Sequence, residues 1–130
     1  MFLQIDAHNG LAVYDQIVRQ VKFAVADGAL SAGELVPSVR ELARELTINP
    51  NTVARAYRQL QVDGVLEVVR GTGLAVVAAA RRLCQAERVK LIRARLRTVL
   101  EEAANSGLDP QEIEQLVRAE SLAARRNKQK

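Results

Sequence analysis

The residues of this 130-residue chain best suited to chemistry are polar side chains between positions 49 and 59. An Asn amide can pair with the edge of adenine, an Arg guanidinium with guanine or phosphate, and a Thr hydroxyl with phosphate oxygens. Such side chains near the start of a helix predict a surface that reads DNA. The alternative is a solvated amphipathic helix in which Asn and Thr serve only as caps. The residues on or beside this face are Asn51, Thr52, Arg55, Arg58 and Gln59.

Two short helices are predicted to position this face. Ser38 lies three residues before Glu41, which is the spacing of a capping box, so a first helix should begin after Ser38. Apolar residues then recur at helical spacing as far as Leu46. Asn49 is a good N-cap and Pro50 suits the first position of a second helix. The pattern is that of a helix-turn-helix.

A hairpin is predicted directly after the second helix. Gly64 can take the left-handed conformation that closes this helix. Residues 65–70 and 74–77 are short β-rich runs, and Gly-Thr-Gly between them supplies a permissive turn. A hairpin in this place is a wing, whose Arg70 and tip can reach a groove or the phosphates. A plain turn is the alternative interpretation, and the two are compatible.

Upstream residues complete the domain. Apolar residues between Tyr14 and Val25 keep helical spacing, Gly28 should end this helix, and residues 30–35 form a connecting loop. The segment 2–5 is predicted to be a small strand laid on the domain. The expected fold class is therefore mainly α with a small β-hairpin, a winged helix-turn-helix over residues 1–78.

Residues 11–78 resemble the DNA-binding domain of the GntR family of bacterial transcription regulators. The runs PSVRELA (37–43) and NPNTVARAY (49–57) are similar to its YtrA-type subfamily, which has the shortest C-terminal domain. Two departures, Ala32 before Gly33 and Val36 before the proline, affect no contact position. The resemblance implies DNA contacts at Ser38, Arg40, Asn49, Asn51, Thr52, Arg55, Arg70, Gly71 and Thr72.

The C-terminal region predicts a helical hairpin for dimerisation over residues 79–124. Residues 79–105 contain neither Gly nor Pro, residues 105–107 break the helix, and Asp109-Pro110 starts another. Two such helices cannot bury both apolar faces alone, so we expect them to pack against the same hairpin of a second chain. The alternative is that they fold back on their own winged domain. Residues 125–130 are predicted to be a basic flexible tail. The predicted interface consists of Val89, Ile92, Leu96, Val99, Leu100, Ile113, Leu116 and Val117.

The net charge of +4 gives no independent support for DNA binding. Residues 1–80 hold seven Lys and Arg against eight Asp and Glu, whereas residues 81–130 hold twelve against seven. The excess positive charge therefore lies outside the predicted DNA-binding domain. The support is local, because four arginines should converge on one surface. They are Arg40, Arg55, Arg58 and Arg70.

Composition argues against several other classes. The chain has one Cys and one His, which suggest no catalytic constellation, no metal site and no cofactor, and Cys84 is expected to be a buried or interface residue. No run is long enough to span a membrane and no signal segment opens the chain, so a cytoplasmic protein is expected.

The predicted function is sequence-specific regulation of transcription, as a repressor and as a homodimer on double-stranded DNA with an inverted repeat. An unidentified small-molecule effector is expected, if there is one, at the dimer interface or near residues 77–80. The alternative is a winged-helix module that binds proteins without sequence-specific DNA binding.

Overall fold

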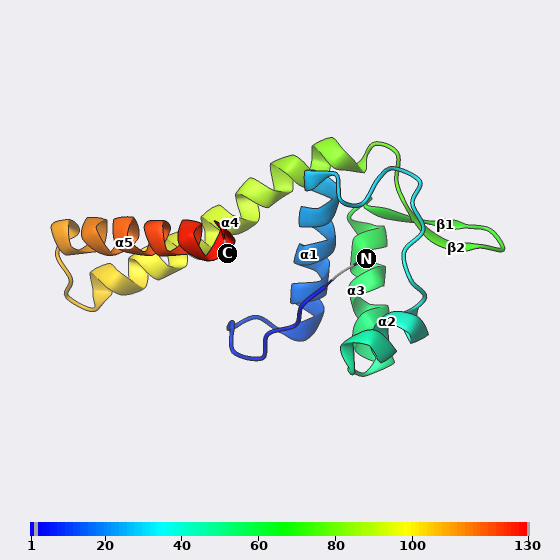
Figure 1. Cartoon of the computed structure of the whole chain (residues 1–130), viewed down its shortest axis with the longest axis horizontal. Helices are drawn as coiled ribbons and strands as arrows, with labels where there is room; N and C mark the ends of the chain where they lie inside the picture. The colour runs from blue at the N-terminus through cyan, green and yellow to red at the C-terminus, as the bar shows by residue number, and fades with distance from the viewer. Residues whose placement is uncertain (2, 130) are drawn as a thin grey trace. The chain divides into compact units, whose positions relative to one another are not determined.

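Local capping signals mark several of the helix ends in the computed structural model, which describes Met1 and residues 3–129 (Figure 1). The described chain is mainly helical with one small antiparallel hairpin, as predicted. It divides into two compact units, Met1–Val89 and the residues from Lys90 onward. The elements, in order, are α1 (Val13–Asp27), α2 (Val39–Leu46), α3 (Pro50–Val62), β1 (Leu66–Val69), β2 (Gly73–Val76), α4 (Ala80–Asn105) and α5 (Pro110–Gln129).

The predicted caps of the first three helices are present. The Glu41 amide donates to the Ser38 hydroxyl oxygen at 3.1 Å, and the Ser38 amide donates to the Glu41 carboxylate at 3.2 Å. These two bonds complete a capping box at the start of α2. At the start of α3, the Asn51 amide donates to the Asn49 side-chain oxygen at 2.8 Å. Helix α1 ends at Gly28, whose φ of 86° is left-handed.

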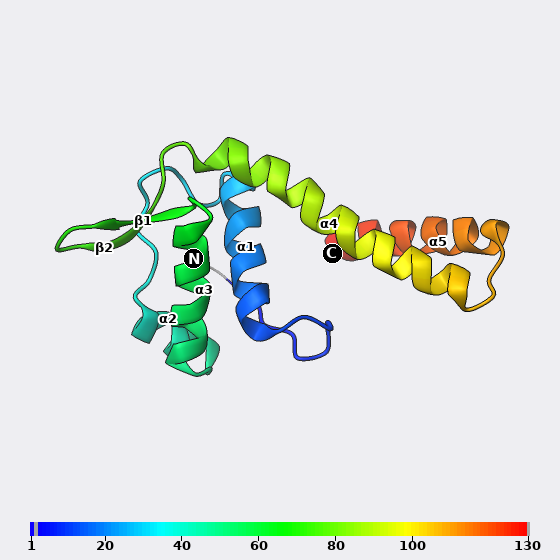
Figure 2. The same cartoon turned by 180° about the vertical axis from the view of Figure 1, so that it is seen from behind.

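Helix α3 is the central element of the first unit. It packs along α1 and across α2, and Figures 1 and 2 show α1 and α3 side by side from both directions. The Tyr57 hydroxyl donates to the Pro37 carbonyl at 2.8 Å, which ties α3 to the loop before α2. Burial raises the pKa of this tyrosine. The largest fully buried side chains are Ile17, Val21, Val25, Leu42, Val53, Leu60, Val65, Val76 and Cys84.

The predicted hairpin is present, and a segment that the sequence did not single out extends it. Leu66 pairs with Val76 and Val69 with Gly73 in an antiparallel register. On the outer side of β2, Leu35 forms an isolated bridge with Ala75. The Gly33 amide also donates to the Val76 carbonyl, at 2.8 Å, and the Val36 amide donates to the Leu74 carbonyl at 2.9 Å. The loop before α2 therefore binds the base of the wing as a third, short edge.

The prediction of a strand at the N-terminus is wrong for residues 3–5, and Phe2 lies outside the described residues. The side chains of two glutamines of α1 form hydrogen bonds with the backbone N–H and C=O groups of the N-terminal segment instead. The Gln4 amide donates to the Gln20 side chain at 2.9 Å, and the Gln20 side chain donates back to the Gln4 carbonyl. The buried Gln16 makes the same exchange with Asp6. A side-chain amide carries both a donor and an acceptor, so it replaces the partner strand.

The first turns of α4 belong to the core of the first unit. Ala80 and Cys84 are buried, which confirms the expectation of a buried Cys84. The Gln85 side chain donates to the Ala26 carbonyl at 3.3 Å. The first unit therefore continues to Val89, beyond residue 78, where the sequence pattern predicts the end of the winged domain.

In the second unit, α4 ends at Asn105 and α5 begins after Asp109, as predicted. The Glu112 amide donates to the Asp109 carboxylate at 2.9 Å, which caps α5. Residues 125–129 continue α5, so the expected flexible tail is helical up to Gln129, and Lys130 lies outside the described residues. Basic side chains are favourable near a helix C-terminus. No helix in the described part of the chain is long and apolar enough to cross a lipid bilayer.

Candidate nucleic-acid interface

The first turns of α3 expose the polar side chains that the sequence placed on its outer face. Asn51, Arg55 and Arg58 are exposed and Thr52 is half-buried. The opposite face, from Val53 to Leu60, is buried against α1 and α2. This orientation leaves amide, hydroxyl and guanidinium donors available to an external partner. Their contact with DNA remains a prediction.

Two of the predicted contact residues are also caps. The Asn49 side-chain oxygen accepts from the Asn51 amide, so its NH₂ group remains able to donate. The Ser38 oxygen accepts from the Glu41 amide, and its hydroxyl hydrogen remains able to donate. Each side chain can therefore hold a helix start and a phosphate oxygen at the same time.

Arg55 is held by an aromatic side chain of another helix. Its guanidinium carbon lies 3.6 Å from the centre of the Tyr14 ring, so the two groups stack. Both line a shallow hollow of about 330 Å³ between α1 and the start of α3. Asn51 and Thr52 line the same hollow. Three predicted contact residues are thus brought together beside α1.

A second hollow joins the wing to the start of α2. Its volume is about 560 Å³, and Ser38 and Thr72 both line it, together with Pro37 and Leu74. Two predicted contact residues therefore line one depression, although 34 positions separate them in the sequence.

Arg40 lies in a third hollow beside the start of α3. This hollow, of about 330 Å³, is also lined by Arg44, Ile48 and Pro50. Arg44 was not among the predicted contact residues. Its signal in the sequence is the i, i+4 spacing from Arg40, which places both guanidinium groups on one side of α2.

Arg58, Arg70 and Gly71 line none of these three hollows. Arg58 is exposed on α3, and Arg70 and Gly71 are exposed at the tip of the wing. Gly71 has a φ of 75°, which a side chain would strain, so the tip requires glycine there. The convergence of all four arginines on one surface remains a prediction.

Three carboxylates of the first unit are held by neighbouring groups. Asp15 bonds Arg19 at 3.3 Å, and Asp63 bonds Lys22 at 2.8 Å. The backbone hydrogen bond from Ser38 holds the pKa of Glu41 below its usual value, so this carboxylate is charged but tied back to the cap. Pairing of this kind reduces the repulsion that free carboxylates would exert on phosphates.

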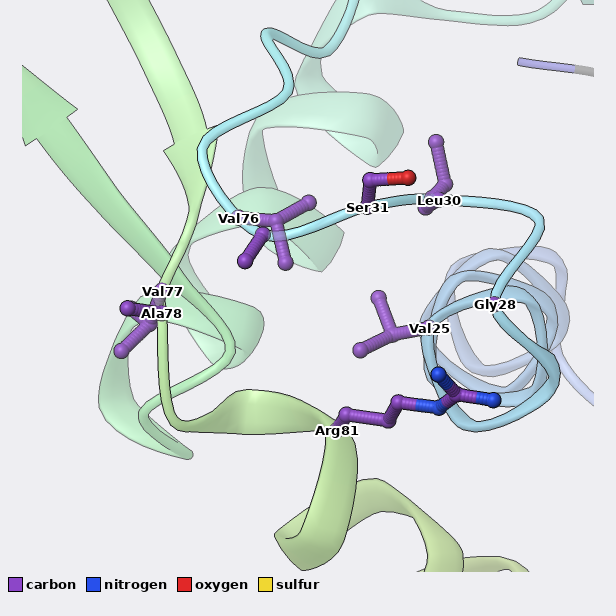
Figure 3. Close-up of a pocket in the computed structure, with 9 residues that line it drawn as sticks. Val25, Gly28, Leu30, Ser31, Val76, Val77, Ala78 and Arg81 are labelled. Carbon is purple, nitrogen blue, oxygen red and sulfur yellow. The ribbon is translucent and has the colours of Figure 1, made fainter.

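Val77 and Ala78, two of the four residues near which an effector is expected, line a small hollow at the end of α1. Figure 3 shows Val76, Val77 and Ala78 on one side of it and Arg81 reaching toward Gly28. Its volume is about 200 Å³, below the range of about 300–1,000 Å³ usual for metabolite sites. The C-terminal end of a helix is electronegative, so Arg81 there complements α1.

Apolar side chains of α4 and α5 are exposed on the single chain. The exposed fractions are 51% for Val89, 50% for Ile92, 48% for Leu96 and 57% for Val99. Leu116 and Val117 are also exposed, and Leu100 and Ile113 are half-buried. These are the eight residues of the predicted dimer interface, which remains a prediction.

Comparison with known proteins agrees with this architecture. The family model described as bacterial regulatory proteins of the gntR family matches residues 13–76. The transcriptional repressor YtrA of Bacillus subtilis is 30% identical over 116 residues, which are 89% of each chain.

Two solved structures extend the likeness beyond the winged unit. A GntR-family regulator from Listeria monocytogenes is 28% identical with a TM-score of 0.68, over 88% of this chain and 98% of that one. YtrA from Sulfolobus acidocaldarius is 29% identical with a TM-score of 0.56, over 92% and 97%. The chain therefore belongs to the GntR family of DNA-binding transcription regulators, in its YtrA-type branch.

Proposed function

We propose that this protein represses transcription by binding an inverted-repeat operator as a homodimer. The observation that carries the proposal is the start of α3, where Asn51 and Arg55 are exposed beside Thr52 on a helix whose other face is buried. The relative from Bacillus subtilis is named a transcriptional repressor, which supports the direction of regulation. As a regulator of bacterial genes, the protein would act in the cytoplasm.

The chemistry of the side chains suggests that some of these residues contact bases and others contact phosphates. The Asn51 amide carries a donor and an acceptor that match the edge of adenine in the major groove, and the Arg55 guanidinium carries donors that match the two acceptors of guanine. Thr52 can contact a thymine methyl group. Arg40 and Arg70 lie outside α3, on α2 and the wing, where they would bind phosphates and fix the register of α3 on the duplex. Ser38, Asn49, Arg58, Gly71 and Thr72 would add further contacts with the phosphates.

The exposed apolar residues of α4 and α5 support the dimer. A two-fold axis between two chains would relate their two recognition helices. Because each helix would then meet the same sequence on opposite strands, the DNA site should be an inverted repeat. Repression would then follow from occupation of the promoter. An effector would release DNA by favouring a dimer in which the two recognition helices lie at a different distance from each other.

The test is selection of bound duplexes from a random pool at roughly physiological ionic strength, because non-specific phosphate binding weakens steeply with salt. The wild type is expected to enrich an inverted repeat. The Asn51→Ala/Arg55→Ala double variant is expected to enrich no sequence while keeping its circular dichroism spectrum. Arg82→Ala serves as the control, since it removes an exposed positive charge from α4 and is expected to leave the selected sequence unchanged.

Three outcomes distinguish the alternatives. Enrichment of a single half-site would support DNA reading but refute the dimeric mode. Enrichment of the same repeat by the double variant would refute the assigned residues. If the wild type enriches nothing, the sequence-specific function is refuted and a protein-binding module is favoured.

A further inference from the structure

The stacking of Arg55 on Tyr14 joins a predicted base-reading residue to a residue that the function has not used. The guanidinium lies 3.6 Å from the ring centre, and the two side chains come from α3 and α1. The Tyr14 ring is half-buried and packs against the hydrophobic core. It therefore offers Arg55 a fixed surface.

This geometry leaves the donors of Arg55 usable. A ring covers one face of the guanidinium, whereas its five N–H donors point outward in the plane of the group. Among the described residues, no carboxylate forms an ion pair with Arg55. Asp15, the neighbour of Tyr14 in α1, bonds Arg19 instead. The stacked guanidinium is thus restrained and still free to donate.

We infer that Tyr14 is a positioning residue that sets the base preference of Arg55, and that Arg55 reads the O6 and N7 edge of one guanine in each half-site. This inference rests on the proposed function. A long, flexible arginine loses rotamer freedom when it binds, and a side chain already restrained in the free protein loses less. Restraint also favours the planar bidentate contact with guanine over a diffuse attraction to any phosphate.

The test compares Tyr14→Leu with Tyr14→Phe on the operator that the selection defines. Arg55→Ala first identifies the base pair that Arg55 reads, as the position where discrimination is lost. Tyr14→Leu keeps an apolar side chain but removes the ring, so discrimination at this pair should fall about two- to fivefold, the range of an exposed cation–π contact. Discrimination at other pairs should not change. Tyr14→Phe keeps the ring and should behave as the wild type.

A double-mutant cycle separates positioning from packing. In an Arg55→Ala background, Tyr14→Leu should have no further effect on DNA binding. An equal loss in that background would show that Tyr14 acts through the packing of α1, and it would overturn the inference. A higher affinity for Tyr14→Leu would also overturn it, because Tyr14 would then hold Arg55 away from DNA.

The remaining outcomes separate this inference from the function on which it rests. A Tyr14→Phe variant as impaired as Tyr14→Leu would assign the effect to the hydroxyl group and refute the stacking role. Suppose instead that the wild type enriches the inverted repeat while Tyr14→Leu discriminates at this base pair as well as the wild type does. That result would refute the inference and leave the proposed function standing. A wild type that enriches no sequence would refute the proposed function, and the inference with it.

Discussion

At the scale of single residues, the proposed DNA-binding surface uses the same side chains for folding and for recognition. Asn49 caps α3 through its oxygen, Ser38 caps α2 through its hydroxyl, and Arg55 rests on Tyr14. Truncation of Asn49 or Ser38 removes a helix cap together with a donor. Loss of affinity after truncation of either cap to alanine is therefore weak evidence for a DNA contact. Substitutions that keep one role and remove the other are more informative.

Asn49→Asp separates capping from DNA contact. Asp is as good an N-cap as Asn, so the free energy of unfolding should stay within about 0.5 kcal/mol of the wild type. The variant lacks the NH₂ donor and adds a negative charge beside the phosphates, so operator affinity should fall about tenfold or more. Denaturant unfolding and fluorescence anisotropy measure the two quantities. Wild-type affinity in this variant would show that Asn49 acts only as a cap.

Cys84 is expected to be chemically inert in the folded protein. It is fully buried, and burial raises the pKa of its thiol because a buried thiolate loses its hydration. Less thiolate is then present at any given pH, and the thiolate is the reactive form. A disulfide reagent should label the native protein about tenfold or more slowly than the unfolded protein. Because the pKa of the native thiol is higher, its labelling rate should still rise with pH where the labelling rate of the unfolded chain has already reached its plateau. Equally fast labelling would contradict the burial.

At the scale of elements, a buried lysine joins three helices of the first unit. Lys22 of α1 lies 2.8 Å from Asp63 at the end of α3 and 3.7 Å from Glu87 of α4. Lys22→Met keeps most of the aliphatic stem but leaves the two carboxylates without their cation. Because both carboxylates are partly exposed and can hydrate, the expected loss is about 1–3 kcal/mol.

Arg19→Met on the same helix is the matched control. It breaks the i, i+4 pair with Asp15, for which a cost of about 0.5 kcal/mol is typical. Urea unfolding at one fixed protein concentration compares the two variants, since association would shift the midpoint. A loss in Lys22→Met no larger than in the control would refute the structural role of the cluster.

Elements governed by local signals could be predicted from the sequence. The capping box at Ser38, the cap and proline that open α3 and the Gly-Thr-Gly tip of the wing each depend on neighbours within a few residues. The exposed face of α3 follows from its helical period. Thr47 is an exception at the same scale, because its left-handed φ of 55° is rare for a β-branched residue and no pattern indicates it.

The missed features depend on contacts between distant segments. The bridge from Leu35 to Ala75 exists only once the hairpin has folded, and the glutamine bonds that replace an N-terminal strand require α1. The stacking of Arg55 on Tyr14 likewise requires α1 to dock on α3, so the sequence could identify Arg55 but not its partner. Small residues such as Ala80 and Cys84 give too weak a pattern to place the start of α4 in the core.

At the scale of the whole molecule, the spacing of exposed residues on α4 indicates how two chains could associate. Val89, Ile92, Leu96 and Val99 follow one another at intervals of three, four and three, the a and d spacing of a coiled coil. Each is about half exposed on the single chain. Apolar rows of this kind on soluble proteins commonly mark interaction sites. Association through α4 would also tether the two winged units to each other, since each is continuous in sequence with its own α4.

The Ile92→Glu/Leu96→Glu variant should therefore be monomeric. Two carboxylates in the centre of the row would have to be buried without partners, which costs more than the apolar contacts gain. Light scattering after size-exclusion chromatography should give the mass of one chain, against two for the wild type. The variant should keep weak binding to an isolated half-site and lose the added affinity for the inverted repeat, because the second reader is no longer tethered.

Val62→Glu is the control for these substitutions. Val62 is 81% exposed on α3, outside the row, so the same change there should leave the dimer intact. A dimeric Ile92→Glu/Leu96→Glu protein would place the interface elsewhere on the chain. A monomeric wild type would refute the homodimer, and an enriched inverted repeat would then require the two chains to meet only on DNA.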